Sequence, residues 1–302
     1  MTALFAGKGG RPKKSASNWR LFKLLLTATL IASCAVAFAE NGAAGWLRYA
    51  PVSNPAQYRS LPANVVPLDH LPTIQSAASE AARGLASMLH RPIQQAEPDI
   101  VQPGIFIGTV AEIESRFPKW KPAAKLKPEG YAIASIRDHG HTDWLIAGAD
   151  ARGALYGTFH LLASIGEQMP ISSLAATSSP AEQMRWVNQW DNLDGSIERG
   201  YAGRSIFFAN GSVRPDLTRA SEYARLLASV GINGCVVNNV NANPRMLTPE
   251  MIAQLARIAD AFRPWGVRLA ISVDLASPKK IGGLDTFDPL DPQVVAWWRK
   301  KT

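Results

Sequence analysis

The sequence predicts an α/β protein built in two successive parts. Residues 40–170 carry short apolar strands and two amphipathic helices, which is typical of a small α+β domain. From residue 184 strands alternate strictly with helices, which indicates a parallel sheet. Three such units fit into residues 184–302, whereas a closed (β/α)8 TIM barrel needs eight units and about 250 residues. We therefore expect the first three units of a TIM barrel, incomplete within this chain.

The predicted elements of the first part rest on local patterns. Residues 40–72 contain five prolines and are expected to be irregular. An apolar stripe with helical spacing predicts a helix over 77–89, and Asp150 is a suitable N-cap for another. The predicted strands are 104–110, 130–137 and 144–147. We expect one sheet with helices on one side, followed by a linker over residues 171–183.

The predicted elements of the second part have clearer boundaries. Thr248-Pro-Glu places a cap and a first-turn proline at the start of a helix that ends near Phe262. Gly231 closes the helix before it, and Asp291 opens the helix after it. The predicted strands are 185–190, 234–238 and 267–273, and the other predicted helix is 216–230.

Composition and charge restrict the classes of protein to be considered. The chain is 47% hydrophobic and 19% charged, which is typical of a globular protein. Its net charge of +8 falls to +2 without residues 1–39, which carry six basic side chains and no acidic one. No basic stripe with interleaved aromatic residues remains, so nucleic acid is not an expected partner.

Residues 1–39 have the organisation of a secretory signal peptide. A basic segment precedes an apolar run that is short for a membrane span, which needs about 20 residues. The run ends in Ala37-Phe-Ala39, a small-x-small cleavage pattern. Cleavage there predicts a secreted or periplasmic bacterial protein without a stable membrane span, and a retained anchor is the alternative. A lipoprotein is a second alternative, because Ile31-Ala-Ser-Cys34 resembles a lipoprotein processing box in which Cys34 becomes the lipidated first residue.

The sequence points to no metal or cofactor. Its two cysteines are Cys34, which is expected to leave with the signal peptide, and Cys235, which lies in an apolar strand and is expected to be buried. Neither a disulfide framework nor a cysteine-based metal site can be built from them. His139 and His141 stand in a predicted turn without further ligands nearby.

Polar residues follow each predicted strand of the second part. Trp190, Asp191 and Asn192 end the first strand, Asn238 and Asn239 the second, and Asp274 the third. The carboxyl ends of barrel strands form the functional face, so these residues are expected to gather at one site. An indole at Trp190 suits stacking on a pyranose ring, although a core position is the alternative; for Trp186, four residues earlier, the core is the favoured interpretation.

Charged and amide side chains continue beyond the first two strands. Arg199 or Arg204 could hold a carboxylate with two parallel hydrogen bonds. Alternatively, Asp194, Glu198, Arg199 and Arg204 pair with each other to hold the loop. After the second strand, Asn239 and Asn241 could bind sugar hydroxyls and Val240 an apolar substituent, or these asparagines form turns that reverse the chain.

The run from Trp186 to Ser205 resembles the start of the catalytic domain of xylan α-glucuronidases, glycoside hydrolase family 67. The stretch from Leu145 to Leu162 is similar to the accessory scaffold domain that precedes the barrel in α-glucuronidases and β-hexosaminidases. The resemblance covers nearly all of the mature chain but only the first part of the family's length. It implies an enzyme that removes (4-O-methyl)-glucuronic acid from xylo-oligosaccharides with inversion and without a cofactor.

The resemblance also assigns residues. It places a substrate-pocket wall at Trp190, Asp191, Asn192, Glu198, Arg199, Arg204, Asn239, Val240 and Asn241. The catalytic carboxylates of the family lie on later strands, and its Lys-x-x-Ser-Glu-Gly motif is absent here, so we expect no catalytic residue in this chain and no activity from it alone. A homodimer is expected only of a full-length enzyme. The alternatives are a non-catalytic carbohydrate-binding remnant, or another exo-glycosidase such as a hexosaminidase.

Overall fold

The computed structural model describes residues 42, 44–239 and 242–301, with Ala44 beginning a compact unit. The predicted signal peptide and the pocket candidates Val240 and Asn241 therefore lie outside the described residues. None of the helices in the described ranges is long and apolar enough to cross a membrane.

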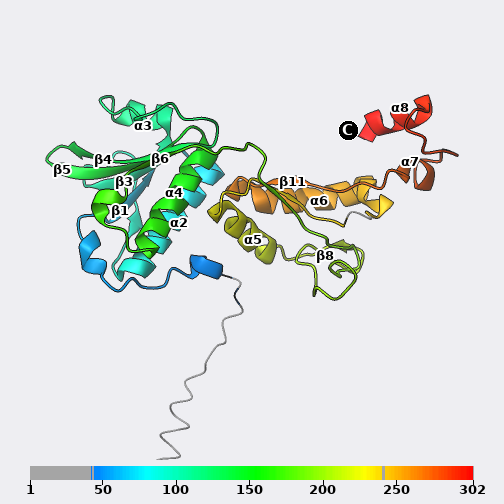
Figure 1. Ribbon diagram of the computed structural model, residues 1–302, viewed down its shortest axis with the longest axis horizontal. Coiled ribbons are helices and arrows are strands. Elements are labelled where there is room, and N and C mark those ends of the chain that lie inside the picture. The colour runs from blue at the N-terminus through cyan, green and yellow to red at the C-terminus, as the bar shows by residue number, and fades with distance from the viewer. Residues whose placement is uncertain (1–41, 43, 240–241, 302) are drawn as a thin grey trace, which may run out of the picture. The chain divides into compact units, whose positions relative to one another are not determined.

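The first part is built on a six-stranded sheet with the order β2-β1-β3-β5-β4-β6 (Figure 1). Strands β2, β1, β3 and β5 run parallel to one another, whereas β4 is antiparallel to both β5 and β6. The strands are β1 (Asn64–Pro67), β2 (Gln94–Gln95), β3 (Gly104–Thr109), β4 (Tyr131–Asp138), β5 (His141–Gly148) and β6 (Ala176–Ser178).

Helices cover both faces of this sheet, so the expectation of helices on one side was wrong. Helices α2 (Pro72–Leu89) and α4 (Ala151–Gly166) pack on one face, and α3 (Val110–Arg116) lies over the other (Figure 1). Successive side chains of a strand point to opposite faces of the sheet. Because helices cover both faces, the central strands carry apolar side chains on both. Phe106 and Leu145 thus point away from α2 and α4 and are buried beneath α3 together with Ile113.

Helix α4 lies unusually close to the sheet because glycines face it. A Cβ atom on Gly153 would lie 2.2 Å from the carbonyl oxygen of Gly130, and one on Gly157 would lie 2.8 Å from a methyl group of Ile146. Residues i and i+4 share one helix face, so the two glycines form a flat strip against β4 and β5. Asp150 caps the helix as predicted, its side chain accepting a hydrogen bond from the Gly153 amide.

The segments around these elements are more regular than expected. The helix predicted over 77–89 begins at Pro72, which occupies its first turn. Residues 40–72 contain strand β1 and two short 3-10 helices, Gly45–Arg48 and Pro55–Tyr58. The predicted linker over 171–183 contains β6, which extends the sheet by pairing with β4.

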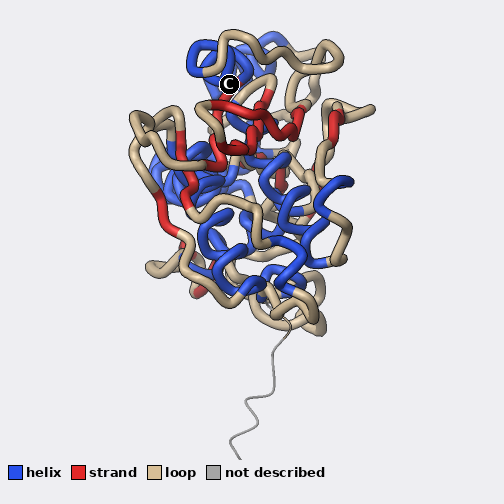
Figure 2. The backbone as a smooth tube through the Cα atoms, turned by 90° about the vertical axis from the view of Figure 1, so that its left-hand side faces the viewer, coloured by secondary structure: helices blue, strands red, loops and turns tan. Residues whose placement is uncertain are grey.

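The second part contains a three-stranded parallel sheet with the order β11-β10-β7, in which β7 (Trp186–Asn188), β10 (Gly234–Val236) and β11 (Arg268–Ala270) follow chain order. The strands are short, and most of residues 189–217 is loop (tan in Figure 2) around a small hairpin that was not predicted, β8 (Phe208–Ala209) and β9 (Ser212–Val213). The helices are α5 (Thr218–Ser229), α6 (Pro249–Phe262), α7 (Ser277–Lys280) and α8 (Pro292–Lys301). A mixed α/β fold with a parallel sheet is thus confirmed.

One buried core runs through both parts. Its members include Leu162 of α4, Leu227 of α5 and Cys235 of β10. Cys235 is fully buried and unpaired, as expected. The continuous core fixes the amino-terminal ends of β7 and β10 against the first part.

Candidate functional site

The exits of β7 and β10 form one pocket. The Asn239 amide donates a hydrogen bond of 2.8 Å to the Asp191 carbonyl oxygen, which joins the two exits side by side. The pocket has a volume of about 250 Å³ and is lined by Asp191, Asn192, Leu193, Asp194, Asn238, Asn239, Ala242, Asn243 and Met246. The structure thus brings together three predicted site residues, Asp191, Asn192 and Asn239.

Asp191 is the most unusual of them. The residue is 1% exposed, and neither carboxylate oxygen has a hydrogen-bond partner among the described residues. Burial raises the pKa of Asp191 to about 6. Burial and the nearby Asp191 charge also raise the pKa of the Cys235 thiol to about 12, so this thiol stays protonated. A buried carboxylate without a partner can accept hydrogen bonds from a ligand that enters the pocket.

The two tryptophans of this strand have different surroundings. Trp190 is 41% exposed, so it is not a core residue and can present its indole to a ligand; it directly precedes Asp191 in the chain but does not line the pocket. Trp186 packs against the neighbouring strand, where a Cβ atom on Gly234 would lie 2.1 Å from its ring. Trp186 is half-buried and does not belong to the buried core, so it packs against the sheet without occupying the core position that was favoured for it.

The loop after Trp190 is held by amide and backbone hydrogen bonds. The Asn192 side-chain amide donates to the Ser196 hydroxyl at 3.0 Å and to the Glu198 carbonyl oxygen at 2.8 Å. Asp194 accepts hydrogen bonds from the backbone amide and the hydroxyl of Ser196, which lower the pKa of Asp194. Asn192 is therefore a structural support of the loop as well as a lining residue.

The charged residues of this loop do not pair with each other. Asp194, Glu198, Arg199 and Arg204 form no ion pair among themselves, so the alternative of a loop held by ion pairs was wrong. Arg199 and Arg204 are exposed. Glu198 is half-buried, and an interaction with its carboxylate raises the pKa of the Tyr201 hydroxyl. Neither arginine lines the Asp191 pocket.

Two further polar residues at strand ends have structural partners. The Asn238 side-chain amide donates to the Ser272 carbonyl oxygen at 2.8 Å, and its oxygen accepts from the Ser272 amide at 2.6 Å. These bonds tie the exit of β10 to that of β11. Asp274 forms an ion pair of 2.7 Å with Lys280, which lowers the pKa of Asp274.

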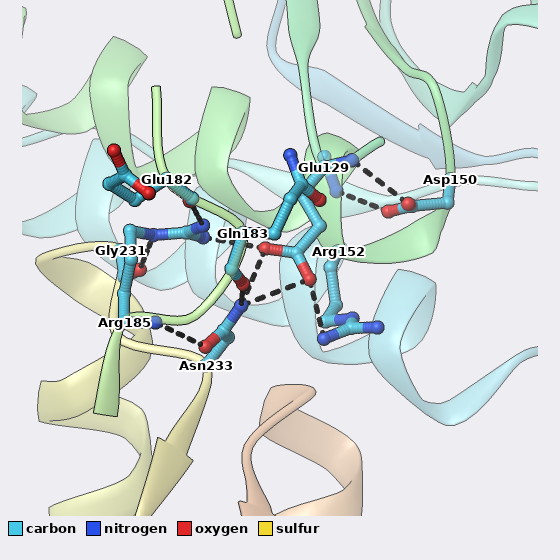
Figure 3. A network of polar contacts seen from close by, with 9 residues as sticks. Glu129, Asp150, Arg152, Glu182, Gln183, Arg185, Gly231 and Asn233 are labelled. Carbon is cyan, nitrogen blue, oxygen red and sulfur yellow. Dashed lines mark hydrogen bonds and ion pairs between the residues drawn. The ribbon is translucent and has the colours of Figure 1, made fainter. Parts of the chain in front are cut away.

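A buried cluster at the opposite strand ends was not predicted (Figure 3). Glu129 is 5% exposed and contacts Arg152 and Arg185 at 2.6 Å each. Its carboxylate also accepts a hydrogen bond of 3.0 Å from Asn233, and its backbone amide donates to Asp150. These residues are distant in sequence, so no local motif shows the cluster. The sequence offered only a weak signal for this cluster, which is that Arg185 and Asn233 each stand one residue before a strand of the second sheet.

Metal binding has no support within the described ranges, where no group of three or more histidine, cysteine, aspartate or glutamate side chains is arranged to hold an ion. The arrangement suits recognition of a hydroxylated ligand whose hydroxyls can donate to the Asp191 carboxylate. An exposed indole, an unpartnered carboxylate and amide groups lie together at the carboxyl edge of a parallel sheet, the position of sites in α/β proteins.

The structure thus defines a two-part α/β protein whose candidate site has the residue types of a sugar-binding pocket. Comparison with protein families identifies the particular family. The N-terminal domain of glycosyl hydrolase family 67 matches residues 45–161, and the middle domain of the same family matches residues 164–302. The chain belongs to glycoside hydrolase family 67, which sets the hexosaminidase alternative aside.

Fungal relatives agree with this assignment. The chain is 44% identical over 290 residues to α-glucuronidase A of Emericella nidulans, covering 92% of this chain and 33% of the relative. It is 45% identical over 281 residues to the probable α-glucuronidase A of Aspergillus clavatus, covering 91% and 33%. The chain therefore spans about a third of the length of these relatives. A solved GH138 enzyme that targets pectin rhamnogalacturonan II matches at 14% identity with a TM-score of 0.48, over 79% of this chain and 36% of its own length.

Proposed function

We propose that this chain forms one wall of the substrate pocket of an α-glucuronidase acting on (4-O-methyl)-glucuronic acid side groups of xylo-oligosaccharides. The observation that carries the proposal is the buried, unpartnered Asp191 carboxylate in one pocket with Asn239, beside the exposed Trp190. The relatives named α-glucuronidase support the reaction and the substrate class.

Each candidate residue has a role that suits a uronic acid. Trp190 provides a stacking surface, and Asp191, Asn192 and Asn239 accept or donate hydrogen bonds to ring hydroxyls. Arg199 or Arg204 pairs with the uronate carboxylate once the ligand is present, since a guanidinium matches that geometry. We assign Glu198, Val240 and Asn241 to the rim of the same pocket, Val240 against the methyl ether.

We further propose that β7, β10 and β11 with their helices are the first three units of a (β/α)8 barrel. Their parallel pairing in chain order supports this arrangement. Inverting hydrolysis needs an acid and a base about 6.5–9.5 Å apart. We place both in the region that corresponds to the remaining length of the relatives, without a cofactor, and expect the purified chain to release no 4-O-methylglucuronate from aldouronic acids. Measurable release would overturn this placement.

Binding of aldobiouronic acid to the purified chain tests the pocket. We expect calorimetry to show binding that weakens about five- to tenfold in Trp190→Ala, because a stacked aromatic contributes on the order of 1–1.5 kcal/mol. Phe287→Ala is the matched control, since Phe287 is a similarly exposed aromatic at 51% and, unlike Trp190, has no pocket-lining residue next to it in the chain. Equal weakening in both variants, or none in Trp190→Ala, would contradict the assignment.

The described pocket groups can bind a sugar without reacting with it, which also suits a second candidate function, a non-catalytic carbohydrate-binding protein derived from such an enzyme. The two functions separate when the chain is fused to the remaining two thirds of a fungal relative. Restored release of glucuronate supports the pocket of an enzyme, whereas binding without turnover in the fusion supports the binding protein.

We also propose that the chain is exported, on the strength of its N-terminal pattern alone. N-terminal sequencing of the mature protein from a bacterial host is the test. A first residue at Glu40 supports cleavage after Ala39, a lipidated Cys34 supports the lipoprotein alternative, and an intact N-terminus in the cell contradicts export.

A further inference from the structure

A second pocket lies at the opposite strand ends from the candidate site. It has a volume of about 440 Å³ and includes Arg185 and Gly231, which precede β7 and β10. Arg185 and Trp190 lie five positions apart on either side of β7, which places this pocket on the order of 15 Å from the other one. Its remaining wall comes largely from β4 and helix α4: Tyr131, Tyr156, His160, Ser164 and Glu167.

Tyr156 has an unsatisfied hydroxyl in this pocket. The residue is 8% exposed, and its hydroxyl has no hydrogen-bond partner among the described residues. The Arg185 guanidinium lies over its ring, 5.6 Å from the centroid. Buried hydroxyls are nearly always hydrogen-bonded, so an orphaned one in a pocket wall indicates a place for a ligand group.

The charges around the pocket disfavour an anion. The donors of Arg185 are engaged with the Gly231 and Glu182 carbonyl oxygens and with the Glu129 carboxylate, at 2.6 Å each. Glu129 and Glu167 add carboxylates to the wall. A uronate would therefore meet negative charge without an available guanidinium, whereas a neutral ligand would meet no such penalty.

The neutral groups of the pocket suit a polyhydroxylated ligand. The Tyr131 hydroxyl and His160 Nδ1 lie 2.5 Å apart, and the aromatic rings of Tyr131, Tyr156 and Phe159 belong to the wall. A second cavity of about 510 Å³ shares Ala163 and Glu167 with the pocket and adds Trp46, so the hollow continues along the end of α4. Aromatic walls with a few polar groups in an elongated hollow are typical of oligosaccharide sites.

We propose that this junction pocket is a second, non-catalytic site that binds the unsubstituted, neutral backbone of xylo-oligosaccharides, with the Tyr156 hydroxyl hydrogen-bonded to a sugar hydroxyl. The choice of a xylose backbone rests on the proposed function, whereas the neutral, hydroxylated character of the ligand rests on the pocket. The site binds the xylose backbone of the substrate at a place on the protein that is remote from the glucuronate pocket.

Titration of the full chain with xylotriose, followed by saturation-transfer NMR, tests the proposal. We expect saturable binding that weakens about fivefold in Tyr156→Phe, the loss of one hydrogen bond. This variant keeps the aromatic ring and its contact with the Arg185 guanidinium, so we expect the fold to be retained. Tyr201→Phe, at the exposed loop beside the other pocket, is the matched control and should bind as the parent does.

Three results would overturn the proposal: no saturable binding of xylotriose, unchanged binding in Tyr156→Phe, or loss of xylotriose binding in Trp190→Ala. Aldobiouronic acid keeps the two proposals distinguishable. If it binds in a Trp190-dependent manner while xylotriose does not bind, the proposed function stands and the second site fails. If xylotriose binding depends on Tyr156 while aldobiouronic acid binding ignores Trp190, the second site stands alone.

Discussion

The two ends of β7 and β10 hold two buried carboxylates with opposite surroundings. At the amino-terminal ends, Glu129 is 5% exposed and is surrounded by Arg152, Arg185 and Asn233. At the carboxyl-terminal ends, Asp191 is 1% exposed and has no hydrogen-bond partner among the described residues. The same pair of strands therefore carries one satisfied and one unsatisfied buried acid.

The difference separates a stabilising group from a binding group. Burying a carboxylate is costly unless charged or hydrogen-bonding partners compensate for lost water. The Glu129 cluster supplies such partners and joins the two parts of the chain, so its loss would leave two arginines facing each other. At Asp191 only the nearby Ser205 hydroxyl offsets the cost, and burial outweighs it, which is typical of sites where a ligand completes the hydrogen bonds.

The largest effect is expected at the satisfied acid. We expect Glu129→Gln to lower the free energy of unfolding by about 3–5 kcal/mol, because removal of one partner from a buried ion pair leaves the other charges uncompensated. Urea denaturation followed by tryptophan fluorescence measures this change.

Glu222→Gln is the matched control for that substitution. Glu222 pairs with Arg219 on α5, but both side chains are about half exposed, at 52% and 49%. We expect a loss below about 0.5 kcal/mol, as is usual for exposed ion pairs. Similar losses in the two variants would show that the Glu129 cluster does not hold the two parts together.

A smaller effect of opposite sign is expected at the unsatisfied acid. The pKa of Asp191 is raised in the fold to about 6, so between about pH 4 and pH 6 the folded state binds more protons than the unfolded state. Stability from this group is present below pH 4 and is lost as the pH rises to 6. A carboxyl pKa raised from about 4 to about 6 costs the folded state at most about 3 kcal/mol at pH 7.

Asp191→Asn removes this penalty while keeping the shape of the side chain. We expect it to stabilise the chain by about 1–2 kcal/mol at pH 7 and to flatten the stability profile between pH 4 and pH 6. Binding of aldobiouronic acid should weaken in the same variant. Thermal melts across this pH range provide the measurement; a destabilised variant at pH 7 would mean that Asp191 has a structural partner.

Elements marked by local chemistry were predictable from the sequence. Asp150 and Thr248 cap α4 and α6 where expected, because a cap acts within three residues of itself. The strands of the parallel sheet were placed by their apolar runs and by the glycines that precede them. Polar residues after those strands correctly indicated that Asp191 and Asn239 meet.

Features that depend on distant partners were missed. Strands β1, β2 and β6 are short, and only their neighbours in the sheet make them strands. The Glu129 cluster assembles residues from four separate segments, so its members look like ordinary surface charges in the sequence. The burial of Asp191 could not be predicted either, since the residue is followed by a polar loop and its surroundings come from β10.

The smallest expected effect is at Asp274, the aspartate at the exit of β11. The exposed Lys280 pairs with the half-buried Asp274 at 2.7 Å and lowers the pKa of Asp274, so the stabilising contribution of the pair is present above about pH 4 and is lost as the pH falls. We expect Asp274→Asn to cost less than about 1 kcal/mol at pH 7 and less again at pH 3. The two aspartates on one sheet edge should thus show opposite pH dependence, measured by urea denaturation at both pH values. A large loss of unfolding free energy at pH 7, or weaker binding of aldobiouronic acid, would instead place Asp274 with Asp191 among the groups that contact the ligand. A partly solvated ion pair that only stabilises the fold weakly would produce neither result.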